Sequence, residues 1–311
     1  MSSGKSQLFK VASIGNANVD ITYKLSRLPE MDEIVLADSY EITTGGSASN
    51  YSYAIAKLGA KSHFIGAIGK DLLGEFFLKE LKQMGVDVSM VQQVDANTGC
   101  VSILIDQTGE KRGVAWRGAN LNLKPTEAWL TLKSFDLVHL AGCTPDVSNW
   151  VVQNIPVKKS FDPGSSSEKY SEKELLSTVS SCEVSYLSTR QVRLVEQKSG
   201  VAIAEFARLK QVVLIEKRGS NGVSVYSPTI CFSIAPVKAN VVDTTGAGDV
   251  FSACFDYIYF TEHDLVKAAK WATVAASLKV TKLGAKAGVP TYHELSEVVA
   301  NFEQSVMPLP I

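Results

Sequence analysis

A glycine-rich stretch near the carboxyl end carries the clearest chemical signal in this 311-residue chain. It reads Asp243-Thr244-Thr245-Gly246-Ala247-Gly248-Asp249, and the apolar run Val250 to Tyr259 after it predicts a buried helix. A turn of this kind presents unpaired N–H groups at the positive end of a helix dipole, where an anion such as phosphate binds. Asp249 at that position suits a general base that accepts a hydroxyl proton. The alternative is a structural turn in which Asp249 only stabilises the helix dipole.

Two further clusters, near the amino end, suit the binding of hydroxyl groups. Gly45-Gly46-Ser47-Ala48-Ser49-Asn50 allows close backbone approach before a helix, and the Asn50 amide can donate or accept. Asn18-Val19-Asp20 follows the first strand, and alternation places Asn18 and Asp20 on one side. Open α/β sheets bind ligands at such strand ends. An ordinary helix entry and a turn-forming Asn/Asp cluster are the structural alternatives.

Short apolar strands alternate with helices along most of the chain, which predicts a parallel sheet covered on both faces. Helices are expected over Ser47–Leu58 and over Asp71–Met84, the latter ended by Gly85. Val241 and Val242 are expected to end a strand before the glycine-rich turn. The other expected strands are Leu8–Gly15, His63–Ile68, Leu137–Ala141, Lys159–Phe161, Val184–Leu187 and Val212–Glu216.

Two segments do not fit this alternation. The first is Leu25–Thr44, in which Glu33–Thr44 reads as extended. The second is Thr98–Asp106 with Arg112–Trp116, which reads as a hairpin around Gln107–Glu110. We expect them to join in space as a small β-sheet lid, formed by about residues 21–45 and 97–118. No repeat or linker interrupts the chain, so residues 1–311 are predicted to form one α/β domain with this lid.

Composition narrows the functional classes. With 31 Lys and Arg against 32 Asp and Glu, the net charge is −1, so no basic field favours nucleic acid or a membrane surface. No apolar run reaches the roughly 18 residues of a spanning helix. Met1–Gln7 lacks the apolar stretch of a signal peptide, so a cytoplasmic location is expected. The five scattered cysteines lack CxxC spacing, which argues against a disulfide framework or a zinc site.

The chain resembles the PfkB, or ribokinase-like, family of carbohydrate and nucleoside kinases. Asp243–Asp249 matches the carboxyl-terminal signature of that family. Gly45–Asn50, continued by Ala56–Gly59 and Ile68–Gly74, matches the amino-terminal one. The resemblance implies a three-layer α/β/α fold with a mostly parallel central sheet plus a small β-sheet lid. It also implies ATP and Mg²⁺ as cofactors.

The same resemblance implies a role for particular residues. Asp249 would be the catalytic base, and the N–H groups of Gly246, Ala247 and Gly248 would form the anion hole. The positions matching the acceptor site are Asn18, Asp20, Gly45, Gly46, Asn50 and Arg117, the last within Trp116–Asn120. The positions matching the ATP site are Lys217, Gly219, Gly222, Thr244, Ala275 and Ala276.

Metal binding is where this chain departs from the family pattern. Some members hold a monovalent cation near the positions of Asp243 and Thr245 with the loop Gly284–Gly288, so K⁺ is a candidate. The family usually has an Asn-x-x-Glu motif that helps to position Mg²⁺. Here the aligned run is Ser188-Thr189-Arg190-Gln191, which lacks the carboxylate that a hard cation prefers.

The resemblance predicts transfer of the γ-phosphoryl group of ATP to a primary hydroxyl of a nucleoside or a sugar. Similarity to archaeal-type nucleoside kinases around Trp116–Asn120, His139–Gly142 and Ser160–Gly164 favours a nucleoside slightly, with lid aromatics Tyr23, Tyr40 and Trp116 against its base. The alternative is a weak or inactive homologue that binds its ligand as a sensor. Lids of this kind often pair between subunits, so a homodimer through the lid is a further expectation.

Overall fold

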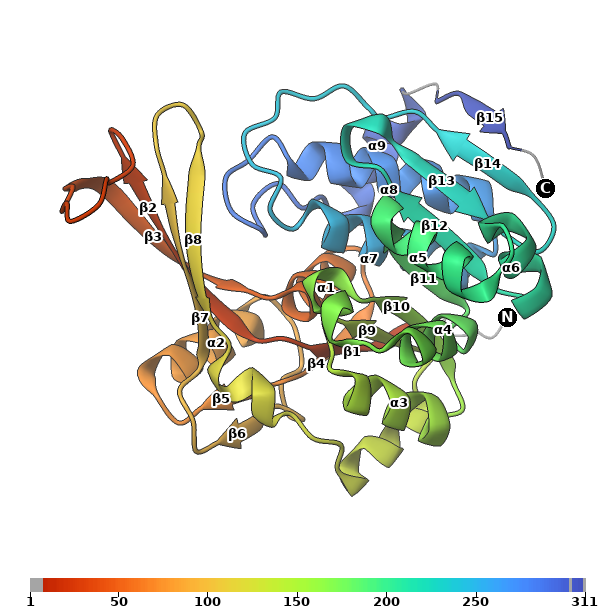
Figure 1. Ribbon diagram of the computed structural model, residues 1–311, viewed down its shortest axis with the longest axis horizontal. Helices are drawn as coiled ribbons and strands as arrows, with labels where there is room; N and C mark the ends of the chain where they lie inside the picture. Colours follow the sequence, from red (N-terminus) through yellow and green to blue (C-terminus); the bar gives the residue numbers. More distant parts are fainter. Residues whose placement is uncertain (1–7, 302–303, 310–311) are drawn as a thin grey trace, which may run out of the picture.

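The computed structural model describes residues 8–301 and 304–309. A nine-stranded sheet forms the centre of the larger part of the molecule (Figure 1). Its strand order is β15-β14-β13-β12-β11-β10-β9-β1-β4. The parallel part comprises β4 (Lys61–Ile65), β1 (Lys10–Gly15), β9 (Leu137–Ala141), β10 (Lys158–Asp162), β11 (Val184–Ser188) and β12 (Val213–Lys217). The parallel strands all end at one edge of the sheet, the place where α/β folds bind ligands.

Helices cover both faces of this sheet because alternate strand residues point to opposite sides. Val11, Val184 and Ile215 belong to a core shared with α1 (Ser47–Lys57), α7 (Ala247–Glu262), α8 (Leu265–Lys279) and α9 (Tyr292–Ala300). Their neighbours Ala12 and Leu214 belong to a second core. That core includes residues of α3 (Pro145–Asn154), α4 (Glu172–Ser180), α5 (Thr189–Ser199) and α6 (Ile203–Lys210). The helices and the sheet therefore form three layers.

A four-stranded sheet stands apart at the left of Figure 1. Its order is β3 (Ala37–Gly45), β2 (Asn18–Leu25), β7 (Gly99–Ile105) and β8 (Lys111–Trp116), joining segments far apart in sequence. Below it lie α2 (Leu72–Gln83) and the pair β5 (Ala67–Gly69) and β6 (Gln92–Val94). Asp71 caps α2 by accepting a hydrogen bond from the Gly74 N–H at 2.8 Å.

Several expected elements differ from the structure. The single strand expected over 63–68 is broken at Gly66 into β4 and β5. Val241 and Val242 do not end a strand: they lie exposed in the loop before α7. The antiparallel edge formed by β13 (Val223–Tyr226), β14 (Cys231–Ile234) and β15 (Val306–Pro308) was not anticipated.

Within the described residues, no helix is long and apolar enough to cross a bilayer. The expectation about a leader rested on Met1–Gln7, which lies outside those residues.

Candidate active site

The glycine-rich turn forms the start of α7 in a conformation that only glycine adopts readily. Gly246 caps the helix with a φ of 77°, and a Cβ there would lie 2.7 Å from the carbonyl oxygen of Ala285. The Ala247 N–H donates to the carbonyl of Thr244 at 3.2 Å. The N–H groups of Gly246, Gly248 and Asp249 have no hydrogen-bond partner among the described residues. These three amides, rather than that of Ala247, are free to bind an anion.

Asp249 lies on the first turn of α7, directly beside these amides. It is half-buried, and burial raises the pKa of its carboxyl group from 3.8 to about 7. Asn50 of α1 opposes that shift, because its Nδ2 donates to Oδ2 of Asp249 at 2.8 Å. The two glycine-rich signatures therefore meet at one carboxylate, whose pKa lies in the range useful for a general base near neutral pH.

The Gly45–Gly46 pair lets β2 and α1 approach each other. A Cβ on Gly45 would lie 2.2 Å from a carboxylate oxygen of Asp20, and one on Gly46 would lie 2.3 Å from the carbonyl of Asn16. Burial raises the pKa of the Asp20 carboxyl to about 6, and the nearby Lys286 ammonium opposes the rise. The backbone therefore requires glycine at position 46, whereas a side chain at position 45 would displace the Asp20 carboxylate.

Buried oxygens next to this pair remain available to a ligand. Oδ1 of Asp20 and Oδ1 of Asn50 are buried and have no hydrogen-bond partner in the described structure. Unpaired buried acceptors of this kind suit the hydroxyl groups of a ligand. Asn18 lies on the same face of β2 as Asp20, but its Oδ1 already accepts from Nδ2 of Asn120 at 2.8 Å.

The side chain of Lys217 lies next to the anion-binding turn. Lys217 ends β12, and a Cβ on Gly248 would lie 3.2 Å from its Nζ. Its ammonium forms an ion pair with the buried Asp162, which ends β10 and also accepts from Ser252 at 3.3 Å. The sequence predicts Lys217 at the ATP site, but it does not single out Asp162, which lies within the family-like run Ser160–Gly164.

The remaining predicted ATP-site and acceptor-site residues are more dispersed. Gly219 begins a short 3-10 turn after β12, and Gly222 follows its last residue. Ala275 is 1% exposed and packs in the core, Ala276 is only partly buried, and Thr244 is exposed. Arg117 precedes the 3-10 turn Gly118–Asn122, and its side chain has no hydrogen-bond partner among the described residues.

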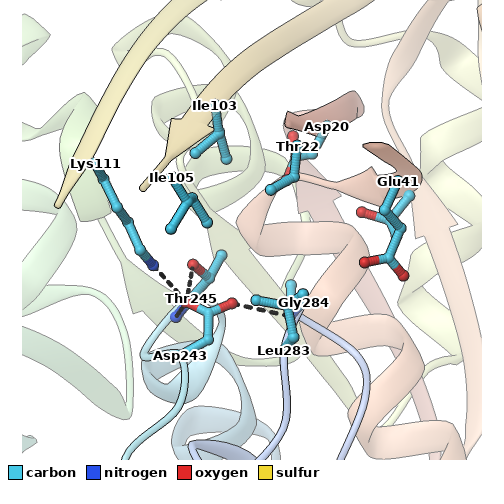
Figure 2. Close-up of a pocket in the computed structure, with 12 residues that line it drawn as sticks. Asp20, Thr22, Glu41, Ile103, Ile105, Lys111, Asp243, Thr245, Leu283 and Gly284 are labelled. Atoms are coloured by element: carbon cyan, nitrogen blue, oxygen red, sulfur yellow. Dashed lines mark hydrogen bonds and ion pairs between the residues drawn. The ribbon is translucent and has the colours of Figure 1, made fainter. Parts of the chain in front are cut away.

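The predicted lid aromatics do not face the site. The register pairs Tyr23 with Tyr40, and Trp116 with Cys100 and Val19, which places all three on the face opposite Asp20 and Thr22. The residues of the four-stranded sheet that line the cavity beside Asp243 are instead Asp20, Thr22, Glu41, Thr43, Ile103, Ile105 and Lys111 (Figure 2). The register therefore places these aromatics on the face away from this cavity, and their contact with a base stays a prediction.

Lys111 closes this cavity by reaching from β8 to Asp243, at 2.7 Å (Figure 2). Oδ1 of Asp243 also accepts from the N–H and the hydroxyl of Thr245, and Oδ2 accepts from the Gly284 N–H. Although burial opposes it, these bonds hold the pKa of the Asp243 carboxyl well below its usual range. The cavity volume is about 20 Å³, room for little more than a water molecule.

The expected monovalent-cation site does not fit these residues. Both carboxylate oxygens of Asp243 are already bonded, and its main-chain carbonyl accepts from the ammonium of Lys279 at 2.8 Å. Asp243 therefore bonds to Thr245 and to two lysines rather than presenting free oxygens to a cation. The sequence reasoning missed Lys111, Lys279 and Lys286; a lysine within the apolar end of a helix was the available signal for Lys279.

The run that replaces the family's Asn-x-x-Glu motif has a structural role here. Ser188 caps α5 by accepting from the Gln191 N–H at 3.3 Å, and Gln191 Oε1 accepts from the Ser188 N–H at 2.8 Å. Gln191 Nε2 donates to the carbonyl of Gly164 at 3.2 Å. This reciprocal cap occupies both side chains. Nowhere in residues 8–301 or 304–309 do three or more His, Cys, Asp or Glu side chains gather as a metal site would require.

Comparison with known proteins agrees with this geometry. The profile described as pfkB family carbohydrate kinase matches residues 8–292. An ATP-dependent ribose-1-phosphate kinase from Halopiger xanaduensis is 29% identical over 285 residues, covering 90% of this chain and 94% of that protein. A ribokinase from Lactococcus lactis is 28% identical over 303 residues, covering 95% of this chain and 97% of the other.

Solved structures give the same answer for the fold. The crystal structure of a nucleoside kinase from Methanocaldococcus jannaschii, a member of the ribokinase family, matches with a TM-score of 0.85 at 23% identity. The match covers 95% of this chain and 99% of that one. The predicted ribokinase-like fold is confirmed. The chain belongs to the pfkB family of carbohydrate kinases, which are phosphotransferases with an alcohol group as acceptor.

Proposed function

We propose that the chain transfers the γ-phosphoryl group of ATP to a primary hydroxyl of a free pentose or a pentose phosphate, with Asp249 as the general base. The observation that carries this proposal is the hydrogen bond between Asn50 and Asp249. It supports the proposal because it joins Asp249, beside the anion-binding turn, to Asn50, whose free oxygen lies on the acceptor side. With a pKa of about 7, the Asp249 carboxylate can take the hydroxyl proton near neutral pH.

The phosphoryl side is built from main-chain amides and one ammonium. ATP supplies the phosphoryl group when bound. The free N–H groups of Gly246 and Gly248, with the nearby Lys217 ammonium, neutralise negative charge on the anion bound there. Asp162 holds Lys217 in position through their ion pair. The side chains of Ser188 and Gln191 cap α5 and are therefore not free to hold Mg²⁺.

The acceptor side favours a sugar over a base. The unpaired oxygens of Asp20 and Asn50 suit hydroxyl groups, and Thr22, Glu41 and Thr43 add polar groups on the same side. The lid aromatics that favoured a nucleoside lie on the opposite face. The ribose-1-phosphate kinase and the ribokinase among its relatives are consistent with a pentose. Release of Lys111 from Asp243 would open the cavity to it.

The far face of the four-stranded sheet supports the proposed homodimer. Tyr40, Val114 and Trp116 are 66%, 75% and 62% exposed on this face. Exposed apolar side chains gathered on one surface mark interaction sites. A second copy packed there would leave the acceptor side of the sheet free. Sedimentation of the wild type and of Val114→Lys at several concentrations tests this, and a monomeric wild type rejects it.

The decisive assay measures ADP release from Mg²⁺-ATP with ribose, ribose 1-phosphate, other pentoses and nucleosides. We expect turnover with a pentose, its loss in Asp249→Asn, and its retention in Asp146→Asn, an exposed aspartate on α3. Turnover only with nucleosides would reject the proposed acceptor class. Silence across the panel, with stabilisation by a ligand still seen in thermal shift, would instead support a sensor.

A further inference from the structure

Lys279 is a fully buried cation beside the phosphate-binding turn. It lies on the last turn of α8 and is 0% exposed. Its Nζ donates to the carbonyl oxygen of Asp243 at 2.8 Å. Lysine is almost never fully buried unless its charge is paired. Since Asp243 begins the turn that leads to Asp249, the ammonium lies directly beneath the loop that the reaction depends on.

Two loops meet at this ammonium and are held to each other. The N–H groups of Val242 and Asp243 both donate to the carbonyl of Val280, at 2.8 and 3.1 Å. The Gly284 N–H donates to Oδ2 of Asp243 at 2.9 Å. The segment 242–246 is thereby joined to the end of α8 and the loop after it. Lys279 supplies a fully buried positive charge at that junction, close to the negative charges of Asp243 and Asp249 and to the partly exposed ammonium of Lys111.

At this junction Asp243 offers no free oxygen to a metal ion. The Asp243 carboxylate already accepts from Lys111, Thr245 and Gly284. Its carbonyl accepts from Lys279. An ε-ammonium is a compact point charge with three donors, and it carries the same charge as K⁺ toward carbonyl oxygens.

We propose that the Lys279 ammonium is a built-in cation that replaces a dissociable monovalent metal ion, so that the phosphate loop is ordered and the kinase is active without K⁺. Lys279 is a positioning residue, since it acts through the backbone of Asp243. The inference rests on the proposed kinase function, but it also concerns the stability of the loop itself.

The test compares salts of equal ionic strength: KCl, NaCl, NH₄Cl and tetramethylammonium chloride, the last too large for a carbonyl site. For the wild type we expect rates within about twofold and equal melting temperatures in all four salts. Lys279→Met keeps the apolar stem but removes the charge. We expect it to lose about tenfold or more in rate in tetramethylammonium, because small misplacements at a reacting centre are costly. We also expect partial recovery in K⁺ or NH₄⁺, with a K⁺-specific rise in its melting temperature.

Lys270→Met, a half-buried lysine on the same helix, is the matched control and should resemble the wild type in each salt. A wild type that needs K⁺ for activity or for stability would overturn the proposal. So would an equal deficit of Lys279→Met in every salt, since a purely structural role predicts that result. If Lys279→Met does not fold, the wild-type salt series decides. If no acceptor is turned over, the kinase proposal fails while the melting temperatures still decide this one.

Discussion

Removing the Asn50 side chain should shift the pH dependence of turnover upward. Asn50 donates at 2.8 Å to Asp249, and this bond lowers a pKa that burial has raised to about 7. A hydrogen bond to a charged group contributes about 1.5–3 kcal/mol, and 1.36 kcal/mol corresponds to one pKa unit. Because Asp249 is only half-buried, water will replace part of the lost bond. We therefore expect a rise of about one unit in Asn50→Ala.

The assay is kcat/KM for the acceptor from pH 5 to pH 9.5, which reports ionisations of the free enzyme. With a pKa of about 7, roughly a tenth of the wild type is ionised at pH 6; after a one-unit rise, roughly a hundredth is. The variant should therefore lose about tenfold more at pH 6 than at pH 9. Loss of an acceptor contact would lower kcat/KM equally at every pH, so the two effects separate.

Other charged groups near Asp249 define the control. Asp162 raises its pKa and Lys217 lowers it, and neither is altered in the variant. Asp20, with a pKa of about 6, should add a second ionisation at lower pH to the kcat/KM profile of both the wild type and Asn50→Ala. Asn154→Ala, which removes an exposed amide bonded only within α3, should leave the profile unchanged. If the apparent pKa on the acid side of the kcat/KM profile is unchanged or lower in Asn50→Ala, the argument is refuted.

Three further changes test other parts of the site. Asp249→Asn should lower turnover at least about a thousandfold. It should also unfold at higher urea than the wild type at pH 8 but not at pH 4. The reason is that a folded-state pKa raised from 3.8 to about 7 costs stability as pH rises through that window, and equal midpoints at pH 8 would contradict this. Gln191→Glu keeps the acceptor that caps α5 but loses the donor to the Gly164 carbonyl. It should lower the Mg²⁺ concentration for half-maximal rate severalfold; an unchanged Mg²⁺ titration would mean that the motif has been functionally replaced. Gly45→Ala places a Cβ 2.2 Å from the Asp20 carboxylate, so calorimetry should show weaker acceptor binding with unchanged ADP binding, and normal acceptor affinity would show that Asp20 can move aside.

Local patterns account for the parts of the fold that were predicted. The strand expected over Leu137–Ala141 has the same bounds in the structure, because a buried apolar run carries its own signal. The four-residue strands β13 and β14 carry much less signal, and antiparallel pairing at the sheet edge defines them. The faces of Tyr23 and Trp116 depend on register, which residue type alone does not reveal.

The parts of the site that the sequence predicts are likewise the ones whose residues are contiguous. The glycine-rich turn was identifiable because its residues are contiguous. The lysines were not, because their partners are distant: Lys279 bonds a residue 36 positions away, Lys111 one 132 away, and Lys286 one 242 away. A lysine in sequence shows neither its burial nor the carbonyl it reaches. The reciprocal cap of Ser188 and Gln191 has a recognisable spacing, but the resemblance to a metal motif directed attention away from it.

The pairing of α1 with α7 also has a consequence for how the chain is made. Asn50 and Asp249 are 199 residues apart, and ribosomes add about 5–20 residues per second, so Asn50 waits roughly 10–40 s for its partner to be synthesised. During that interval Tyr51 and Ile55 of α1, both 0% exposed in the finished protein, lack the α7 side of their core. The nascent amino-terminal half therefore exposes apolar surface to which chaperones bind. Premature termination before α7 would leave an inactive, aggregation-prone fragment.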